Sequence, residues 1–131
     1  AGLPGMLLAI FLEDRTFTLV ERSGKKAGFL RSTAAVLDVV DRVNILSCDL
    51  KEVNTKFDIV VLRAFREFGD FYPNLKKVTE PGGLIVAYKA KVDSIKHDLR
   101  SAGISDSGKY EIKEVKVPFL DEQRHLLKIS V

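Results

Sequence analysis

The chain has 131 residues, 46% of them hydrophobic and 30% charged, which is the composition of an ordinary soluble globular domain. Its longest apolar run, Met6 to Leu12, is too short to cross a bilayer, and the residues from Ala1 onward have neither the basic region nor the cleavage site of a signal peptide. The net charge of +3 and the pI near 9.0 favour a polyanionic partner only weakly.

The stretch from Ala1 to Glu21 has the pattern of a nucleoside-binding turn. A glycine-rich turn over residues 2–5 leads into a helix predicted over residues 3–13, and a strand over residues 17–21 ends in Glu21. The helix is apolar nearly all round, so we expect it to be buried. Glycines let the backbone approach a ligand, and a carboxylate about twenty residues later is placed to accept hydrogen bonds from ribose hydroxyls. This stretch predicts the nucleoside-binding half of an open α/β sheet.

A capped helix and two strands are predicted next. Ser23 can cap a helix that runs to about residue 39 or 40. Its apolar face comprises Ala27, Leu30, Ala34 and Leu37. Val43–Leu46 is a short strand, and Asp58–Leu62 is the clearest strand of the chain. The continuous apolar run of the latter predicts burial on both faces, as in a parallel sheet.

The second half of the chain alternates helix and strand before its period changes. Helices are predicted over residues 69–78 and 92–102, with a turn at 81–83 and a strand at 84–88 between them. Polar and apolar residues then alternate over 110–117 and again over 125–131, which predicts an antiparallel hairpin. The predicted fold class is therefore α/β, with a mostly parallel sheet, a C-terminal antiparallel pair and one domain over residues 1–131.

Charged residues follow the predicted strands at their carboxyl ends, where open α/β sheets bind ligands. They are Glu21, the stretch Cys48–Lys51, Arg63 and Lys89. Glu21 is the candidate ribose ligand, and Leu50–Lys51 can offer backbone groups and an apolar wall to a purine ring. Arg63 is a permanently charged planar donor after a buried strand, so it must reach water or an anion. A solvated strand end is the competing interpretation at each position.

Acid–base machinery is not evident in the sequence. His125 opens an amphipathic strand beside Arg124, which favours a structural or phosphate-contacting role over that of a general base. No Ser/His/Asp or Cys/His grouping and no acid pair for hydrolysis emerges. Cys48 is the single cysteine, which excludes an internal disulfide and favours a reducing cytoplasm. With only His97 and His125 beside it, we expect no metal site.

Several stretches together resemble the glucose-inhibited division protein B family, the bacterial small-subunit rRNA methyltransferases that act on guanine N7. The matching stretches are Gly2–Gly5, Phe17–Glu21, Lys25–Lys26, Phe29–Arg31, Leu62–Phe65, Tyr88–Lys89, and Val117–Pro118 through Asp121 to Arg124–Leu126. They follow the family's order and spacing along the whole chain. The Arg-Ala-Phe stretch and the terminal Arg-His-Leu hairpin are the most specific of them.

The resemblance implies a class I methyltransferase fold that uses S-adenosylmethionine. The cofactor-binding positions that it implies are Gly2, Leu3, Glu21, Asp49, Leu50, Lys51 and Arg63. Gly2 and Leu3 would line the methionine–ribose region, Glu21 would hold the ribose hydroxyls, and residues 49–51 would bracket the adenine. Arg63 falls on the family's cofactor-side arginine, which faces the target nucleotide.

The resemblance also implies the reaction, which is methylation of a guanine N7 in 16S rRNA. The partner would be that RNA or the small ribosomal subunit, in the cytoplasm, and we expect a monomer. The basic residues expected to meet RNA are Lys25, Lys89, Arg124 and His125. Guanine N7 has an in-plane lone pair and no proton, so methyl transfer needs no general base and rests on alignment and electrostatics. Arg63 would then act by positioning.

The sequence departs from the family pattern in two places. An aspartate-bearing strand, two further glycines and an N-terminal helical segment are absent before Ala1, so we expect a truncated domain that is by itself a poor enzyme. The edges of the strands near Leu19 and Ile59 would then be unpaired. Around Asp49 the usual Arg-Ala-Glu-Glu is changed, which predicts backbone rather than side-chain contacts to adenine.

Two other functions remain open on the sequence alone. The absent first strand favours a non-catalytic RNA-binding or assembly module. A glycine turn followed by an acid also suits a nicotinamide-dependent oxidoreductase. The terminal antiparallel pair and the Arg-Ala-Phe stretch argue against the oxidoreductase.

Overall fold

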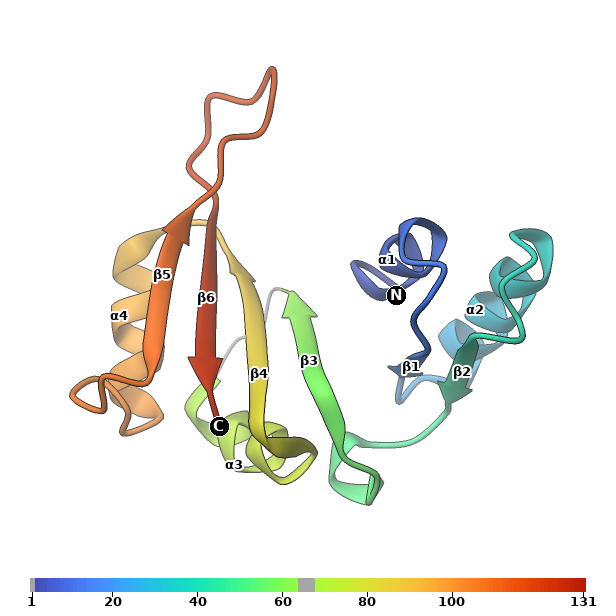
Figure 1. Ribbon diagram of the computed structural model, residues 1–131, viewed down its shortest axis with the longest axis horizontal. Coiled ribbons are helices and arrows are strands. Elements are labelled where there is room, and N and C mark those ends of the chain that lie inside the picture. The colour runs from blue at the N-terminus through green and yellow to red at the C-terminus, as the bar shows by residue number, and fades with distance from the viewer. Residues whose placement is uncertain (1, 64–67) are drawn as a thin grey trace. The chain divides into compact units, whose positions relative to one another are not determined.

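The computed structural model describes residues 2–63 and 68–131, and the chain divides into two compact units, residues 1–53 and 54–131 (Figure 1). Each unit is described by itself. Part of the Arg-Ala-Phe stretch, Ala64 and Phe65, lies outside the described residues. In the described ranges no helix has the length and apolar character needed to cross a membrane. The assignment of one domain to residues 1–131 stays a prediction.

The first unit alternates helix and strand as the sequence predicts. Its elements are α1 (Gly5–Phe11), β1 (Phe17–Val20), α2 (Gly24–Val36), β2 (Val43–Leu46) and a 3-10 turn, η1 (Leu50–Glu52). The two strands pair in parallel, from Phe17 opposite Val43 to Val20 opposite Leu46. The helix α2 ends earlier than predicted because Asp38 adopts a left-handed φ of 54°, which stops the helical hydrogen-bond pattern.

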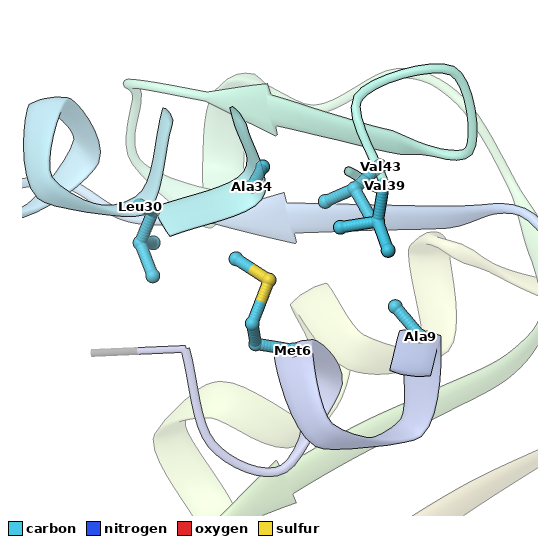
Figure 2. Close-up of a cluster of buried hydrophobic side chains, with 6 residues drawn as sticks. All are labelled: Met6, Ala9, Leu30, Ala34, Val39 and Val43. Atoms are coloured by element: carbon cyan, nitrogen blue, oxygen red, sulfur yellow. The ribbon is translucent and has the colours of Figure 1, made fainter. Parts of the chain in front are cut away.

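The core of the first unit lies where α1 and α2 meet the two strands (Figure 2). Its buried side chains are Met6, Ala9, Leu30, Ala34, Val39 and Val43, with Phe17, Leu19 and Ile45 packed against them. The predicted burial of α1 is confirmed on the side of Met6 and Ala9, but Leu7 and Phe11 are 49% and 79% exposed. Within residues 1–53 the helix has a single apolar layer to pack on, so only one side of it is covered.

The second unit contains the longer sheet. Its elements are β3 (Phe57–Arg63), α3 (Phe68–Lys77), β4 (Thr79–Lys89), α4 (Val92–Ser101), β5 (Tyr110–Glu114) and β6 (His125–Ser130). The strand order is β3-β4-β6-β5, in which β3 and β4 are parallel and β6 is antiparallel to both of its neighbours. The predicted α/β fold with a reversed C-terminal pair is confirmed.

The turn predicted at Pro81–Gly83 is wrong, because β4 runs through these residues. The pairing with β3 shifts between Phe57 opposite Thr79 and Ile59 opposite Leu84, so the extra residues form an irregularity inside the strand. Two hydrogen bonds with Val131 stabilise this irregularity. The Val131 carbonyl accepts the Gly82 N–H at 2.8 Å, and its own N–H donates to the Gly83 carbonyl at 3.0 Å.

One face of the second sheet is covered by α3 and α4 (Figure 1). Side chains from paired positions of β4 and β6 fill this face and are at most 1% exposed: Ile85, Ala87, Leu127 and Ile129. On the other face Ile59 is 56% exposed, so the predicted burial of β3 on both faces is wrong for this unit. Among the described residues β1 pairs only with β2 and β3 only with β4, as expected for the outer edges at Leu19 and Ile59.

Two helical glycines predict opposite responses to alanine. A Cβ added at Gly69 in α3 would lie 2.6 Å from the Ser101 carbonyl oxygen, whereas one added at Gly28 in α2 meets nothing within 4 Å. We expect Gly69→Ala to lower the free energy of unfolding by about 1–3 kcal/mol through this clash, and Gly28→Ala to raise it by about 0.5–1 kcal/mol through backbone entropy. Urea titration of both variants checks this, and a stabilised Gly69→Ala would contradict the close packing of α3 on α4.

Candidate functional site

Glu21 and the loop after β2 lie at the carboxyl ends of two adjacent parallel strands. The last pair of this sheet is Val20 with Leu46, and the Glu21 N–H donates to the Leu46 carbonyl at 3.0 Å. The chain from Ser47 onward leaves β2 at the same edge. The structure therefore brings the predicted ribose ligand and the predicted adenine loop together within the first unit.

The Glu21 carboxylate is half-buried and is oriented by the turn into α2. Its Oε1 accepts the Ser23 N–H at 2.9 Å, and the Ser23 side chain in turn caps α2 by accepting the Lys26 N–H at 3.4 Å. An ionised carboxylate has about four lone-pair sites, so one N–H occupies only part of its capacity. The group thus keeps a fixed position and can accept further hydrogen bonds from a pair of hydroxyls.

Asp49 forms a capping box with the turn that follows it. Its side chain accepts the Lys51 N–H at 3.0 Å, and the Glu52 carboxylate accepts the Asp49 N–H at 2.8 Å. The Asp49 carboxylate and the N–H groups of residues 49 and 51 are therefore engaged inside the protein. The side chain of Leu50 is half-buried and Lys51 is exposed, so the apolar wall of Leu50 is the part of the adenine prediction that this geometry supports.

Only glycine suits position 2, because of its backbone conformation and because of the close packing around it. Gly2 adopts a φ of +82°, its carbonyl accepts the Met6 N–H at 2.7 Å, and a Cβ at this position would lie 2.6 Å from a methyl group of Leu30. Leu3 beside it is 50% exposed. Lys25 lies in the first turn of α2 and is exposed.

Arg63 is the last residue of β3, at the carboxyl end of that strand, and not in the loop after it. It is exposed and lies opposite Tyr88 of β4. Lys89 follows Tyr88 and lies opposite His125 of β6. Three of the predicted basic site residues, Arg63, Lys89 and His125, therefore gather at one edge of the second sheet.

Lys89 is buried in an ion pair instead of facing solvent. Its Nζ lies 2.5 Å from Oδ2 of Asp98 in α4, with the two side chains only 7% and 8% exposed. The same ammonium lies 5.6 Å from the ring centroid of Phe68 at the start of α3. Lys89 thus joins β4, α3 and α4, and its placement does not support the RNA contact predicted for it. The Phe68 ring also contacts the Tyr72 ring, and burial raises the pKa of the Tyr72 phenol, which stays neutral.

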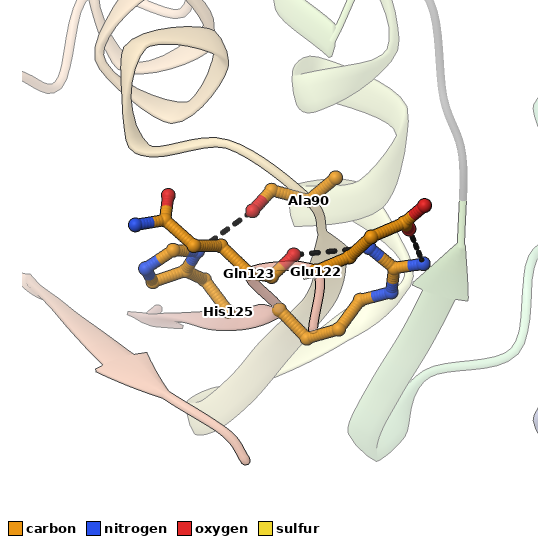
Figure 3. A network of polar contacts seen from close by, with 5 residues as sticks. Ala90, Glu122, Gln123 and His125 are labelled. Atoms are coloured by element: carbon orange, nitrogen blue, oxygen red, sulfur yellow. Dashed lines mark hydrogen bonds and ion pairs between the residues drawn. The ribbon is translucent and has the colours of Figure 1, made fainter. Parts of the chain in front are cut away.

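His125 is also held inside the second unit (Figure 3). It is 6% exposed, and its Nδ1 lies 2.8 Å from the Ala90 carbonyl oxygen, which makes it the donor of that hydrogen bond. Beside it, Arg124 donates to the Glu122 carboxylate at 2.6 Å and to the Gln123 carbonyl at 3.0 Å. Of the two, only Arg124 keeps part of its side chain, 38%, at the surface. The described residues hold no cluster of three potential metal ligands.

Asp98 is the buried charged residue that sequence reasoning missed. It lies between Ile95 and Leu99 on the buried face of α4. The signal was present, because an acid at an apolar helical position must be paired with a cation. Lys89 is that cation.

Solved structures define the class of fold. A predicted O-methyltransferase of Agrobacterium tumefaciens superimposes with a TM-score of 0.78 at 22% identity, over 98% of this chain and 68% of that one. The TYW2 protein of M. jannaschii, solved in complex with AdoMet, gives a TM-score of 0.71 at 12% identity over 96% and 62%. The chain has the class I methyltransferase fold.

The family follows from sequence comparison. The family model described as rRNA small subunit methyltransferase G (GidB) matches residues 1–127, and the chain belongs to this family. Proteins named ribosomal RNA small subunit methyltransferase G are 38% identical in Borrelia hermsii over 97% of this chain, and 32% identical in Brachyspira hyodysenteriae over 99% of it. The chain spans 60% and 63% of the length of these two relatives.

The buried ion pair predicts a large loss of stability when it is broken from one side. We expect Lys89→Met to lower the free energy of unfolding by about 3–5 kcal/mol because it leaves the Asp98 carboxylate buried and unpaired. The double variant Lys89→Met/Asp98→Leu should lose much less, because neither charge remains. Chemical denaturation measures both.

The control is Lys128→Met, which removes the exposed ion pair with Glu111 (side chains 39% and 63% exposed). The free energy of unfolding of this variant should fall by no more than about 1 kcal/mol. A Lys89→Met protein as stable as Lys128→Met would show that the burial of this pair has no energetic weight.

Proposed function

We propose that the protein transfers a methyl group from S-adenosylmethionine to N7 of a guanine in 16S rRNA. The observation that carries the proposal is the family match over residues 1–127. The position of Glu21 at the carboxyl end of β1 supports it, because a fixed carboxylate there suits the two hydroxyls of a ribose. We propose further that the protein works in the cytoplasm, as a monomer, on the RNA or on the small ribosomal subunit.

The residues of the first unit fit the adenosine part of this cofactor. S-adenosylmethionine supplies an electrophilic methyl group when it is bound. Glu21 would accept hydrogen bonds from the ribose hydroxyls, and the half-buried Leu50 would give the adenine an apolar surface. Gly2 and Leu3 would line the methionine side. The capping box of Asp49 holds this loop in shape and makes no contact to adenine in this proposal.

The second unit would orient the RNA without abstracting a proton. Guanine N7 has no proton to lose, so positioning and electrostatics are the whole contribution of the protein. A cation beside a purine that gains positive charge does not help directly. Arg63 is therefore assigned to positioning an anionic group of the cofactor or RNA. Arg124 of this unit and Lys25 of the first unit are assigned to phosphate contacts. No RNA contact is proposed for Lys89 or His125, which are tied to Asp98 and to the Ala90 carbonyl.

The direct test is incorporation of a radioactive methyl group from S-adenosylmethionine into small-subunit RNA. Labelling of a guanine at N7 is expected. A protein that neither bound S-adenosylmethionine nor labelled the RNA would refute the proposal. RNA binding with strong salt dependence and no cofactor binding would instead indicate an assembly module.

Glu21→Gln is expected to weaken S-adenosylmethionine binding about tenfold, because hydrogen bonds to a charged acceptor are stronger than those to a neutral amide. The amide oxygen can still accept the Ser23 N–H, so the melting temperature should change little. Isothermal titration with S-adenosylhomocysteine measures the affinity. Asp41→Asn, an exposed acid before β2 at the opposite end of the strands, is the matched control and should bind as the parent does.

Arg63→Ala is expected to cut the rate of methylation at least tenfold while the melting temperature stays nearly unchanged, because the side chain is exposed. Arg100→Ala removes another exposed arginine, from α4, and should leave the rate intact. Single-turnover labelling and thermal unfolding separate the two effects. If Arg63→Ala melts well below Arg100→Ala, the role of Arg63 is structural.

A further inference from the structure

The loop that joins β5 to β6, residues 115–124, presents a fully exposed aromatic side chain. Phe119 is 107% exposed, and its neighbours Val117 and Leu120 are 42% and 40% exposed. Figure 1 shows the loop projecting beyond the sheet at the end where β3 ends. Phe119 also has a left-handed φ of 64°, which a bulky side chain rarely adopts. An aromatic group held outward in this way indicates a binding contact.

Internal hydrogen bonds give the loop a defined shape. The Val115 N–H donates to the Arg124 carbonyl at 2.8 Å and closes its base, and the Leu120 N–H donates to the Val117 carbonyl at 3.2 Å near its tip. The ion pair between Arg124 and Glu122 adds a third constraint. The arms of the loop line an open hollow of about 260 Å³. This volume lies just below the range of sites for drug-sized ligands, so it suits a single ring system.

The lining of the hollow combines apolar groups with carboxylates. Val115, Val117 and Leu120 supply the apolar part, Lys116 and Gln123 are also in the lining, and Glu114, Asp121 and Glu122 supply the carboxylates. Arg124 already engages the Glu122 carboxylate, and Phe119 stands at the tip outside this lining. Ionised carboxylates only accept hydrogen bonds. The Watson–Crick edge of guanine presents two adjacent donors, N1–H and the 2-amino group. Adenine and cytosine place an unprotonated ring nitrogen beside their amino group, and uracil places its N–H between two carbonyls, so both arrangements repel a carboxylate.

We propose that this loop binds an unpaired guanine base of the RNA, with Phe119 stacked on the ring and Asp121 accepting its Watson–Crick donors. The proposal rests on the proposed function, since it assumes an RNA substrate. Proteins read single-stranded RNA by stacking bases on aromatic side chains and hydrogen-bonding their Watson–Crick edges. Guanine held in this way keeps N7, on its opposite edge, uncovered.

Charge favours RNA over a protein as the occupant. Residues 54–131 contain 14 Lys and Arg against 11 Asp and Glu, whereas residues 1–53 contain 7 of each, so the second unit carries the whole excess of +3. Residues 113–124, the loop with the end of β5, are neutral, because Lys113, Lys116 and Arg124 balance Glu114, Asp121 and Glu122. The unit thus attracts phosphates while the loop reads a base. An apolar tip of three side chains is far smaller than the roughly 800 Å² that each partner buries in a stable protein interface.

The absence of tryptophan from the sequence allows a direct measurement. Phe119→Trp creates a single tryptophan at the tip of the loop, whose emission can be excited apart from that of the three tyrosines. We expect a single-stranded RNA oligonucleotide with one guanine among uridines to quench its emission saturably, and the all-uridine oligonucleotide to quench it at least tenfold less tightly. Phe11→Trp, at an exposed phenylalanine of α1, is the matched control and should respond to neither RNA. Equal quenching of the Phe119→Trp protein by guanine, adenine and uridine oligonucleotides would overturn the proposal.

Two base analogues and one acid variant test the hydrogen bonds. Inosine, which lacks the 2-amino group, should bind more weakly than guanine, whereas 7-deazaguanine should bind equally well because it keeps the Watson–Crick edge. Asp121→Asn in the Phe119→Trp background should abolish the preference for guanine over adenine while quenching persists, and Asp106→Asn, an exposed acid outside the loop, should preserve it. A preference for guanine unchanged by Asp121→Asn would remove Asp121 from the proposal.

The failure of this proposal can be told from failure of the proposed function. Quenching by guanine RNA in a protein that transfers no methyl group would support the loop and refute the enzyme. Normal methylation by Phe119→Ala, with RNA affinity unchanged, would refute the loop and leave the enzyme in place. Methylation by the parent protein, together with an RNA affinity about tenfold lower for Phe119→Ala and unaltered S-adenosylhomocysteine binding, is the result that supports both.

Discussion

The buried ion pair between Lys89 and Asp98 is the constraint on which the carboxyl edge of the second sheet depends. It joins β4 to α4, and the Phe68 ring beside the ammonium adds α3. One residue further on, the Ala90 carbonyl accepts the His125 ring N–H and ties β4 to β6. Because charges at 7% and 8% exposure are tolerated only as a pair, β4 and α4 cannot shift apart without breaking it. The exposed Arg63 ends β3, which pairs with β4 from Ile59 to Arg63 and is connected to these contacts through that pairing.

The two units divide the proposed work by charge. Residues 1–53 have balanced charges and hold Glu21 and Leu50, which suit a nucleoside that is recognised by hydrogen bonds and apolar contact. Residues 54–131 have the entire basic excess and the projecting Phe119, which suit a polyanion whose bases are exposed. The cofactor would thus be bound by shape and hydrogen bonding, and the RNA by its long-range field and a local base contact.

Much of the fold was predictable because the patterns were local. The alternation over 110–117 and 125–131 predicted the antiparallel pair, and Ser23 predicted the start of α2. The structure does not support the RNA contacts predicted for Lys89 and His125, and the reason is physical. The sequence places both residues at strand ends but does not tell on which face of the sheet each side chain lies. The orientation of the Lys89 side chain depends on Asp98 of α4, and that of the His125 ring on the Ala90 carbonyl. The prediction of a turn at Pro81–Gly83 was wrong because Val131, far away in the sequence, forms hydrogen bonds with Gly82 and Gly83.

The pairing of Lys89 also has a consequence for the proposed chemistry. Methyl transfer to N7 leaves the purine with a positive charge, so every uncompensated cation near it raises the barrier. At the edge where β3 and β4 end, Asp98 compensates Lys89 and Glu122 compensates Arg124. A purine brought to this edge would meet these two compensated cations and the exposed Arg63, so the field there is weaker than the count of basic residues indicates. Phosphates would instead be attracted by the basic excess of the unit as a whole, so in the proposed reaction the two paired cations would add little to the charge that methyl transfer creates.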